Sequence, residues 1–185
     1  MANKLSLMAL TLIILVSGTG FSQSTIFGSD ETQNIQGLLI GGLVRNDPFG
    51  TNMGAGARYW HEYFGGDFAA SFYSADLEDD TGATSEFSVF SVGFSALAGF
   101  PIRRFKPHLS VGYQYDSSDI IFGGNISQSA VRVALGVDFL AGEHFVLGVD
   151  TLDFSYILDA DFNNTGTFSG SRFGFFNALR VYYKF

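Results

Sequence analysis

Hydrophobic and polar residues alternate along most of the chain, and the last segment shows this pattern most clearly. The odd positions are mostly apolar or aromatic: Phe173, Phe175, Asn177, Leu179, Val181, Tyr183 and Phe185. The even positions hold every charge of the segment: Arg172, Gly174, Phe176, Ala178, Arg180, Tyr182 and Lys184. A period of two residues is typical of a β-strand, whose side chains point alternately to opposite faces. The segment therefore predicts a strand with one apolar face.

The same alternation recurs upstream and predicts an all-β chain. Between Val131 and Phe139, for example, apolar residues alternate with Arg132, Ala134, Gly136 and Asp138. Eight strands are predicted near residues 35–45, 53–64, 67–76, 86–99, 107–116, 127–140, 144–157 and 170–185. The pattern slips by one residue near Thr151-Leu152 and near Val89-Phe90, and each slip indicates a β-bulge.

Composition indicates which face of these strands points outward. Only 15% of the residues are charged, against about 25% in an ordinary soluble domain. Mid-strand, the polar face is built from small residues: Gly93, Ser95, Ser110, Gly112, Ala134 and Gly136. A water-exposed sheet face would carry many more Lys and Glu residues. We therefore predict an eight-stranded antiparallel up-and-down transmembrane β-barrel over 35–185, with lipid outside and a narrow polar lumen. A soluble lipocalin-like barrel, apolar face inward, is the alternative.

The N-terminal segment has the layout of a secretory signal peptide. Lys4 precedes a twelve-residue apolar run, Leu5 to Val16, and small or polar residues follow it. Twelve residues are too few to cross ~30 Å of hydrocarbon as a helix, which takes about 20. We expect residues 1–22 to be cleaved, residues 23–34 to form a polar lead-in, and the mature chain to reach the bacterial outer membrane.

Cleavage is expected to leave Gln23 as the mature N-terminus. Gly20 and Ser22 supply the small residues that signal peptidase requires at the −3 and −1 positions; cleavage after Gly20 is the alternative. N-terminal sequencing of the protein extracted from membranes tests this prediction. A product that retains Leu5 to Val16 would contradict export.

The connections between the predicted strands differ at the two ends of the barrel. From a periplasmic N-terminus, four loops lie outside (46–52, 77–85, 117–126 and 158–169) and three turns inside (Gly65-Gly66, Gly99 to Lys106 and Ala141 to Glu143). Acidic residues gather in or beside the outer loops: Asp47, Asp76, Glu78, Asp79, Asp80, Asp119, Asp159 and Asp161. The net charge is −8. We interpret these loops as solvated, with weak binding of divalent cations as the alternative.

Two stretches resemble a known family. The ending Leu179-x-Val181-x-Tyr183-x-Phe185 resembles the terminal-strand signal that directs outer-membrane barrels to insertion. The stretch Lys106 to Tyr113 resembles the strand with Pro, an aromatic residue and Gly-Tyr of the OmpA/OmpX-like superfamily, with His108 at the aromatic position. The resemblance implies a small outer-membrane barrel whose partners are the barrel assembly machinery, membrane lipid and lipopolysaccharide. We expect a monomer, no cofactor and no nucleic-acid partner.

Six charged residues are predicted to face the lumen: Arg58, Glu62, Arg132, Asp138, Asp150 and Arg180. An arginine on the lipid face near the bilayer midplane would cost ~2–4 kcal/mol, whereas a guanidinium inside can bridge carboxylates of neighbouring strands. Asp150 and Arg180 lie at similar heights on adjacent strands and are the first pair expected. We interpret the set as a structural network. An ion-conducting pore is the alternative, although eight strands leave little room inside.

Few residues suggest chemistry. His108-Leu109-Ser110 superficially resembles the His-x-Ser of lipid A deacylases, but no carboxylate lies near in sequence to orient the imidazole. His61 and His144 stand alone and cysteine is absent, so no metal site is predicted. The sequence favours a non-enzymatic structural or surface-interaction role. The alternatives are a small channel or transporter for ions or small apolar solutes and, third, a lipid A-modifying enzyme.

Overall fold

The structure is a computed structural model that describes residues 34–47, 50–78, 84–120, 124–162 and 169–185. These residues form β1 (Gly37–Asp47), β2 (Gly50–His61), β3 (Phe64–Glu78), β4 (Thr84–Gly99), β5 (Phe105–Ile120), β6 (Gly124–Leu140), β7 (Phe145–Phe162) and β8 (Gly170–Lys184). The predicted signal peptide, residues 1–22, lies outside the described residues. Within those residues, no helix has the length and apolar character needed to cross a membrane.

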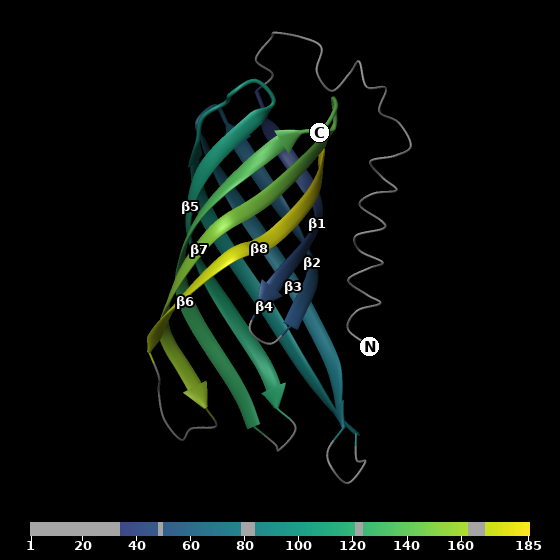
Figure 1. Cartoon of the computed structure of the whole chain (residues 1–185), viewed down its shortest axis with the longest axis vertical. Coiled ribbons are helices and arrows are strands. Elements are labelled where there is room, and N and C mark those ends of the chain that lie inside the picture. Colours follow the sequence, from purple (N-terminus) through teal and green to yellow (C-terminus); the bar gives the residue numbers. More distant parts are fainter. Residues whose placement is uncertain (1–33, 48–49, 79–83, 121–123, 163–168) are drawn as a thin grey trace. The chain divides into compact units, whose positions relative to one another are not determined.

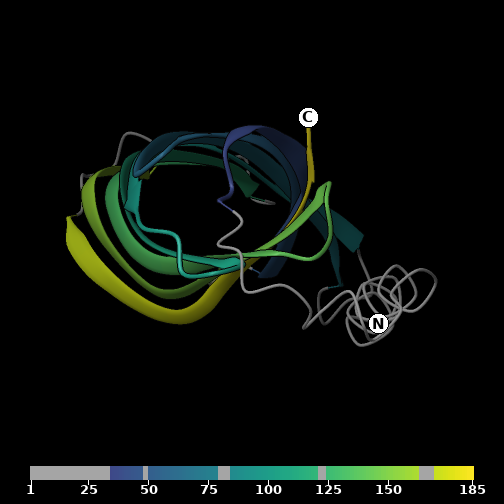
Figure 2. The same cartoon turned by 90° about the horizontal axis from the view of Figure 1, so that it is seen from above.

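The eight strands form a closed barrel. Each strand pairs antiparallel with the next along the chain, and β8 pairs with β1, for instance at Val44 and Leu179. Figure 1 shows the tilted strands from the side and Figure 2 shows them as a ring. The predicted eight-stranded antiparallel up-and-down barrel is therefore confirmed.

The two ends of the barrel differ. We call one the turn end, where Glu62-Tyr63, residues 100–104 and residues 141–144 connect strands. The opposite end is the loop end, where several strands run further than predicted. β7, for example, continues to Phe162 instead of ending near residue 157. The predicted outer loops are accordingly too long, because backbone pairing continues through polar segments in which the alternation of apolar residues has stopped. Ser117, for example, still pairs with Ser127 on the next strand.

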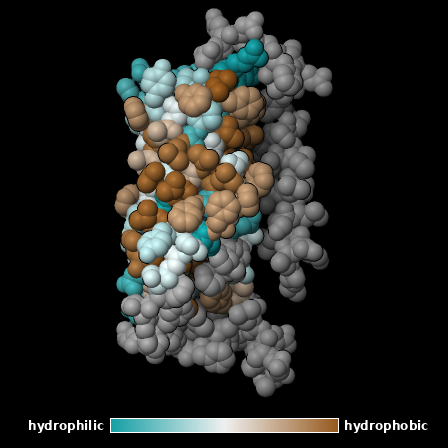
Figure 3. Space-filling view, turned by 60° about the vertical axis from the view of Figure 1, so that its left-hand side comes forward, coloured by the Kyte–Doolittle hydropathy of each residue, from teal (hydrophilic) through white to brown (hydrophobic). Residues whose placement is uncertain are grey.

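The apolar face of the barrel is the outer one. Large exposed hydrophobic side chains surround the strands, among them Phe68, Phe72, Phe94, Val111, Leu135 and Phe154. Figure 3 shows hydrophobic side chains over the middle of one face and hydrophilic ones toward its upper end. The lumen holds the buried arginines and aspartates instead. This distribution is opposite to that of a lipocalin-like soluble barrel, which the structure therefore excludes.

One of the two predicted bulges is present. Thr151 is an extra residue between Asp150 and Leu152, which face consecutive residues of β6, and its hydroxyl donates to the Leu135 carbonyl at 3.0 Å. The prediction of a bulge near Val89-Phe90 is wrong, because the pairing of β4 with both neighbouring strands is continuous there. An unpredicted bulge in β8 carries Phe176 at a φ of 51°, which turns its ring to the outside although the alternation placed it inside.

The turn predicted at Gly65-Gly66 lies three residues earlier. The strands reverse at Glu62-Tyr63, and both glycines belong to β3. A Cβ atom on Gly65 would lie 2.8 Å from Cε3 of the Trp60 indole. This glycine therefore makes room for a buried ring rather than for a reversal of the chain.

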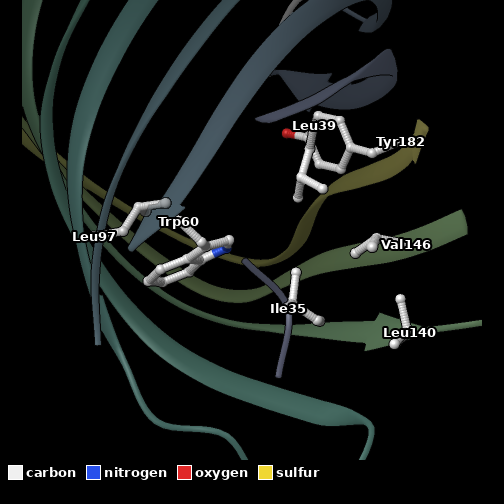
Figure 4. Packing of buried hydrophobic residues seen from close by; sticks show 7 residues of the cluster. All are labelled: Ile35, Leu39, Trp60, Leu97, Leu140, Val146 and Tyr182. Atoms are coloured by element: carbon white, nitrogen blue, oxygen red, sulfur yellow. The ribbon is translucent and has the colours of Figure 1, made fainter. Parts of the chain in front are cut away.

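Apolar side chains fill the lumen at the turn end. Ile35, just before β1, packs there with six residues from six strands: Leu39, Trp60, Leu97, Leu140, Val146 and Tyr182. Figure 4 shows these side chains converging on one space. They close the lumen on the turn-end side of the charged residues described next.

Candidate functional site

A chain of alternating charges crosses the lumen on the loop-end side of the apolar cluster. Three arginines and four aspartates form it, in the order Asp138, Arg58, Asp67, Arg180, Asp150, Arg132 and Asp153. All seven side chains are buried, and they come from five strands: β2, β3, β6, β7 and β8. We call this set the lumen network.

The contacts of the lumen network are close and directional. Arg58 donates to Asp67 at 2.9 Å through Nε and to Asp138 at 2.6 Å through Nη1. Arg180 donates to Asp150 at 2.8 Å and lies 3.4 Å from Asp67. Each of these guanidinium groups therefore joins two carboxylates.

Arg132 completes the network on the loop-end side. Its Nη2 lies 3.3 Å from Asp150, and it donates to Asp153 as well. Asp150 thus lies between Arg180 and Arg132 and accepts a hydrogen bond from each of them. A buried charge is tolerated only when such partners surround it.

Two aromatic side chains tie the lumen network to the apolar cluster. The Trp60 indole N–H donates to Asp138 at 2.9 Å, and the Tyr182 hydroxyl donates to Asp67 at 3.0 Å. The Arg58 guanidinium also lies 5.4 Å from the centre of the Tyr182 ring. Trp60 thus binds the Asp138 oxygen that Arg58 leaves open, whereas Tyr182 shares with Arg58 the same oxygen of Asp67.

The structure brings together five of the six residues predicted for the lumen. The predicted pair of Asp150 and Arg180 is present. Glu62 requires a correction, because β2 ends at His61 and Glu62 lies in the turn with an exposed side chain and a φ of 47°. Sequence reasoning missed two residues of the network, Asp67, which contacts Arg58 and Arg180, and Asp153, which contacts Arg132.

Lys106 fastens the segment before β1 into the turn end. Its ammonium group donates to the Asn34 side chain at 3.2 Å, to the Ile35 carbonyl at 2.9 Å and to the Glu62 carbonyl. It also lies 4.1 Å from the centre of the Trp60 ring, a cation–π geometry. This contact holds the chain across the lumen at its turn end.

The His-x-Ser stretch does not form a nucleophile and base pair. His108 is buried, with Nδ1 3.2 Å from the Lys106 carbonyl and Nε2 4.0 Å from Asp150. The Ser110 hydroxyl donates to the Ala134 carbonyl at 3.3 Å instead. A nucleophilic serine needs its base within hydrogen-bond reach. The part of the chain that the structure describes also holds no group of three or more His, Cys, Asp or Glu side chains suited to a metal ion.

The residues of the predicted insertion signal lie on the outer face of β8. Leu179 and Val181 are half-buried, and Tyr183 and Phe185 are exposed. The Phe185 ring contacts Tyr183 edge to face, with 5.0 Å between ring centres, and the Phe185 N–H donates to the Leu38 carbonyl at 3.1 Å. The terminal backbone is therefore tied to β1 while the terminal ring faces outward.

A closed eight-stranded barrel with an apolar outside and a charge-filled lumen defines the class of small transmembrane β-barrels. The chain is similar to the crystal structure of Neisserial surface protein A (NspA), an eight-stranded outer-membrane barrel. The similarity covers 83% of this chain and 100% of NspA, with a TM-score of 0.53 and 17% sequence identity. At an identity this low, the structural similarity shows a shared fold and nothing beyond it. No family model and no curated protein sequence matches the chain.

Proposed function

We propose that the protein is an integral outer-membrane barrel of the OmpA/OmpX-like kind, with a non-enzymatic structural or surface-interaction role in a Gram-negative envelope. The observation that carries this proposal is the lumen network. It joins strands across the interior by buried ion pairs while the outer surface is apolar. Because paired charges occupy the lumen, we assign the interior a structural role and assign contact with the surroundings to the loop end.

The outer surface supports the location. Aromatic side chains gather near the turn end, among them Tyr59, Phe64, Phe105, Phe145, Tyr183 and Phe185, as in the interfacial girdles of outer-membrane barrels. We place this end in the periplasm and the loop end outside. Density-gradient fractionation of membranes tests the proposal, because the folded barrel is expected in the outer-membrane fraction. Recovery in the inner membrane or the soluble periplasm would contradict it.

The role is tested by deleting the gene and measuring sensitivity to detergent. A structural role predicts that the deletion strain becomes sensitive, and that a variant neutralised at the loop end, Asp159→Asn with Asp161→Asn, restores resistance as well as the wild type does. A surface-interaction role predicts instead that the deletion strain loses adhesion to surfaces. The neutralised variant then assembles in the membrane but does not restore that adhesion. We also propose that any binding of divalent cations takes place at this acidic end. Wild-type resistance together with wild-type adhesion in the deletion strain would overturn the proposal.

The purified protein is expected to conduct no ions in planar bilayers. The lumen network and the apolar cluster occupy two successive levels of a lumen that eight strands leave just wide enough for side chains. Current recordings after reconstitution test this, with a sixteen-stranded porin as the positive control. Discrete conductance steps that depend on protein concentration would favour the alternative, a small channel.

A further inference from the structure

The β4–β5 hairpin presents two arginines at the turn end. Arg103 and Arg104 are its two central residues, because Ile102 and Phe105 on either side of them exchange backbone hydrogen bonds at 2.7 and 2.9 Å. The Arg104 carbonyl also accepts a hydrogen bond from the N–H of Leu140, at the end of β6, at 2.8 Å. Backbone contacts therefore hold the loop on two sides. Figure 1 shows this hairpin in teal at the upper end, above the label of β5.

The two positive charges of this hairpin are available to an anion from outside the chain. In the part of the chain that the structure describes, neither guanidinium forms an ion pair with a carboxylate. Each of the other two turns carries a glutamate, Glu62 and Glu143. Arg103 has a φ of 56°, which glycine usually supplies at the first central position of a two-residue hairpin loop. Strain of this kind is typical of positions with a function.

The neighbouring side chains place the two arginines at the surface of the membrane. Phe100, Ile102 and Phe105 are apolar and exposed, although they lie next to the charged tip of the hairpin. Apolar side chains beside cationic ones fit the boundary between acyl chains and head groups. The anion at this depth is a lipid phosphate, and a planar guanidinium binds phosphate oxygens in pairs.

An apolar hollow of about 380 Å³, which we call the outer hollow, lies in the lipid-facing wall near the same end. Its lining includes outward-facing residues of the first four strands: Leu38, Ala57, Tyr59, Gly66, Phe68 and Phe94. A Cβ atom added at Gly66 would have its nearest neighbour, the Ser95 carbonyl oxygen, at 3.8 Å. This glycine and its small partner on β4, Ala96, therefore leave space between the aromatic rings.

The order of the two features matches the order of groups in a phospholipid. From Ala96, beside the outer hollow, β4 runs past Gly99 into the hairpin, and the Gly99 N–H donates to the Tyr63 carbonyl of the adjacent turn at 2.8 Å. The hollow thus lies toward the middle of the membrane and the arginines at its surface, as do the acyl chain and the phosphate of a lipid. A second copy of this chain in the same orientation would instead bring like charges to the same height.

We propose that the turn end of the outer wall binds one anionic phospholipid, with its phosphate at Arg103 and Arg104 and an acyl chain in the outer hollow beside Gly66. The inference rests on the proposed function, which places the turn end in the periplasmic leaflet, where phospholipid rather than lipopolysaccharide is found. It adds a ligand class and a site to that function.

Native mass spectrometry of the purified, folded barrel tests the head-group contact. With equal amounts of phosphatidylglycerol and phosphatidylethanolamine added, we expect one phosphatidylglycerol to be retained per barrel, in preference to phosphatidylethanolamine. Arg103→Gln with Arg104→Gln should lower this retention by about tenfold, because the paired donors to the phosphate are lost. Lys184→Gln removes a positive charge from the same end, on β8, and is the control that should bind like the wild type.

Filling the outer hollow tests the acyl-chain contact. Gly66→Leu should lower the retention of phosphatidylglycerol by about tenfold, because the side chain takes the place of the acyl chain. Gly42→Leu is the matched control. Gly42 is also an outward glycine whose added Cβ would lie 3.8 Å from its nearest neighbour, but it does not line the outer hollow. Heat-dependent gel mobility identifies the folded barrel of each variant before the measurement.

Several outcomes would overturn the lipid site. They are wild-type retention in the arginine or the Gly66 variant, an equal loss in Gly42→Leu, equal retention of the two lipids, and displacement of the lipid by excess inorganic phosphate. Barrel dimers without bound lipid would assign the outer hollow to a second copy and overturn the site as well. Failure of the proposed function would be seen separately, as recovery of the unmodified protein outside the outer-membrane fraction.

Discussion

Replacing Asp150 with leucine is expected to lower the free energy of unfolding by about 3–5 kcal/mol, the cost of removing one partner from a buried ion pair. Asp150 contacts Arg180 at 2.8 Å and Arg132 at 3.3 Å. Without Asp150, Arg180 and Arg132 each lose one carboxylate partner. Both guanidinium groups remain buried, where water reaches them poorly. Urea unfolding from lipid vesicles measures the loss. The fluorescence of Trp60, the single tryptophan, reports on it because its N–H bonds to Asp138.

Two further variants separate charge from packing. Asp159→Asn, exposed near the loop end of the same strand, should change stability by less than about 0.5 kcal/mol. Arg180→Met in the Asp150→Leu background should recover part of the loss, because apolar groups of similar size often replace a buried ion pair at little cost. Equal unfolding curves for Asp150→Leu and Asp159→Asn would show that the lumen network contributes nothing at this position.

The strands and the inward arginines were predictable because a β-strand has a strict two-residue period. Arg132 and Arg180 each stand between apolar neighbours, so one choice of face fixes the direction of both. The same parity placed Asp150 beside Arg180. A local pattern can predict these features because each depends only on residues within one strand or on the strand next to it.

The missed residues lie where the period is interrupted. The bulge at Thr151 shifts the alternation by one, and this brings Asp153 inward beside Arg132. The Gly65-Gly66 pair predicts a turn, which makes Asp67 the first residue of a strand, although its side chain is buried in the lumen. The same prediction extends β2 beyond its last residue and so puts Glu62 on the inner face.

Pairs across the lumen depend on information that no single strand contains. Arg58 and Asp138 are 80 positions apart and lie on strands that are not neighbours in the sheet. Whether they meet is set by the stagger of all the strands around the barrel. The alternation gives the face of each residue but not its height relative to the opposite wall.

Removing the terminal ring with Phe185→Ala is expected to reduce the amount of barrel assembled in the outer membrane at least tenfold, with little change in the stability of the barrel that does assemble. Phe185 is 70% exposed, and the one ring contact described for it is with Tyr183, so loss of the ring should cost no more than about 1 kcal/mol. A large assembly defect would therefore come from recognition by the assembly machinery, which the resemblance of the C-terminal strand implies.

Phe145→Ala is the matched control for this prediction. Phe145 is also an exposed aromatic residue at the turn end, and its ring meets the same Tyr183 edge to face, with 5.7 Å between ring centres. The Phe145→Ala variant therefore loses a comparable ring contact but keeps Phe185. It should assemble at wild-type levels. Immunoblots of outer-membrane fractions give the assembled amount, and urea unfolding of refolded protein gives the stability. If Phe185→Ala assembled as well as Phe145→Ala, the terminal residue would be only one more lipid-facing side chain, and targeting would have to depend on other features of β8.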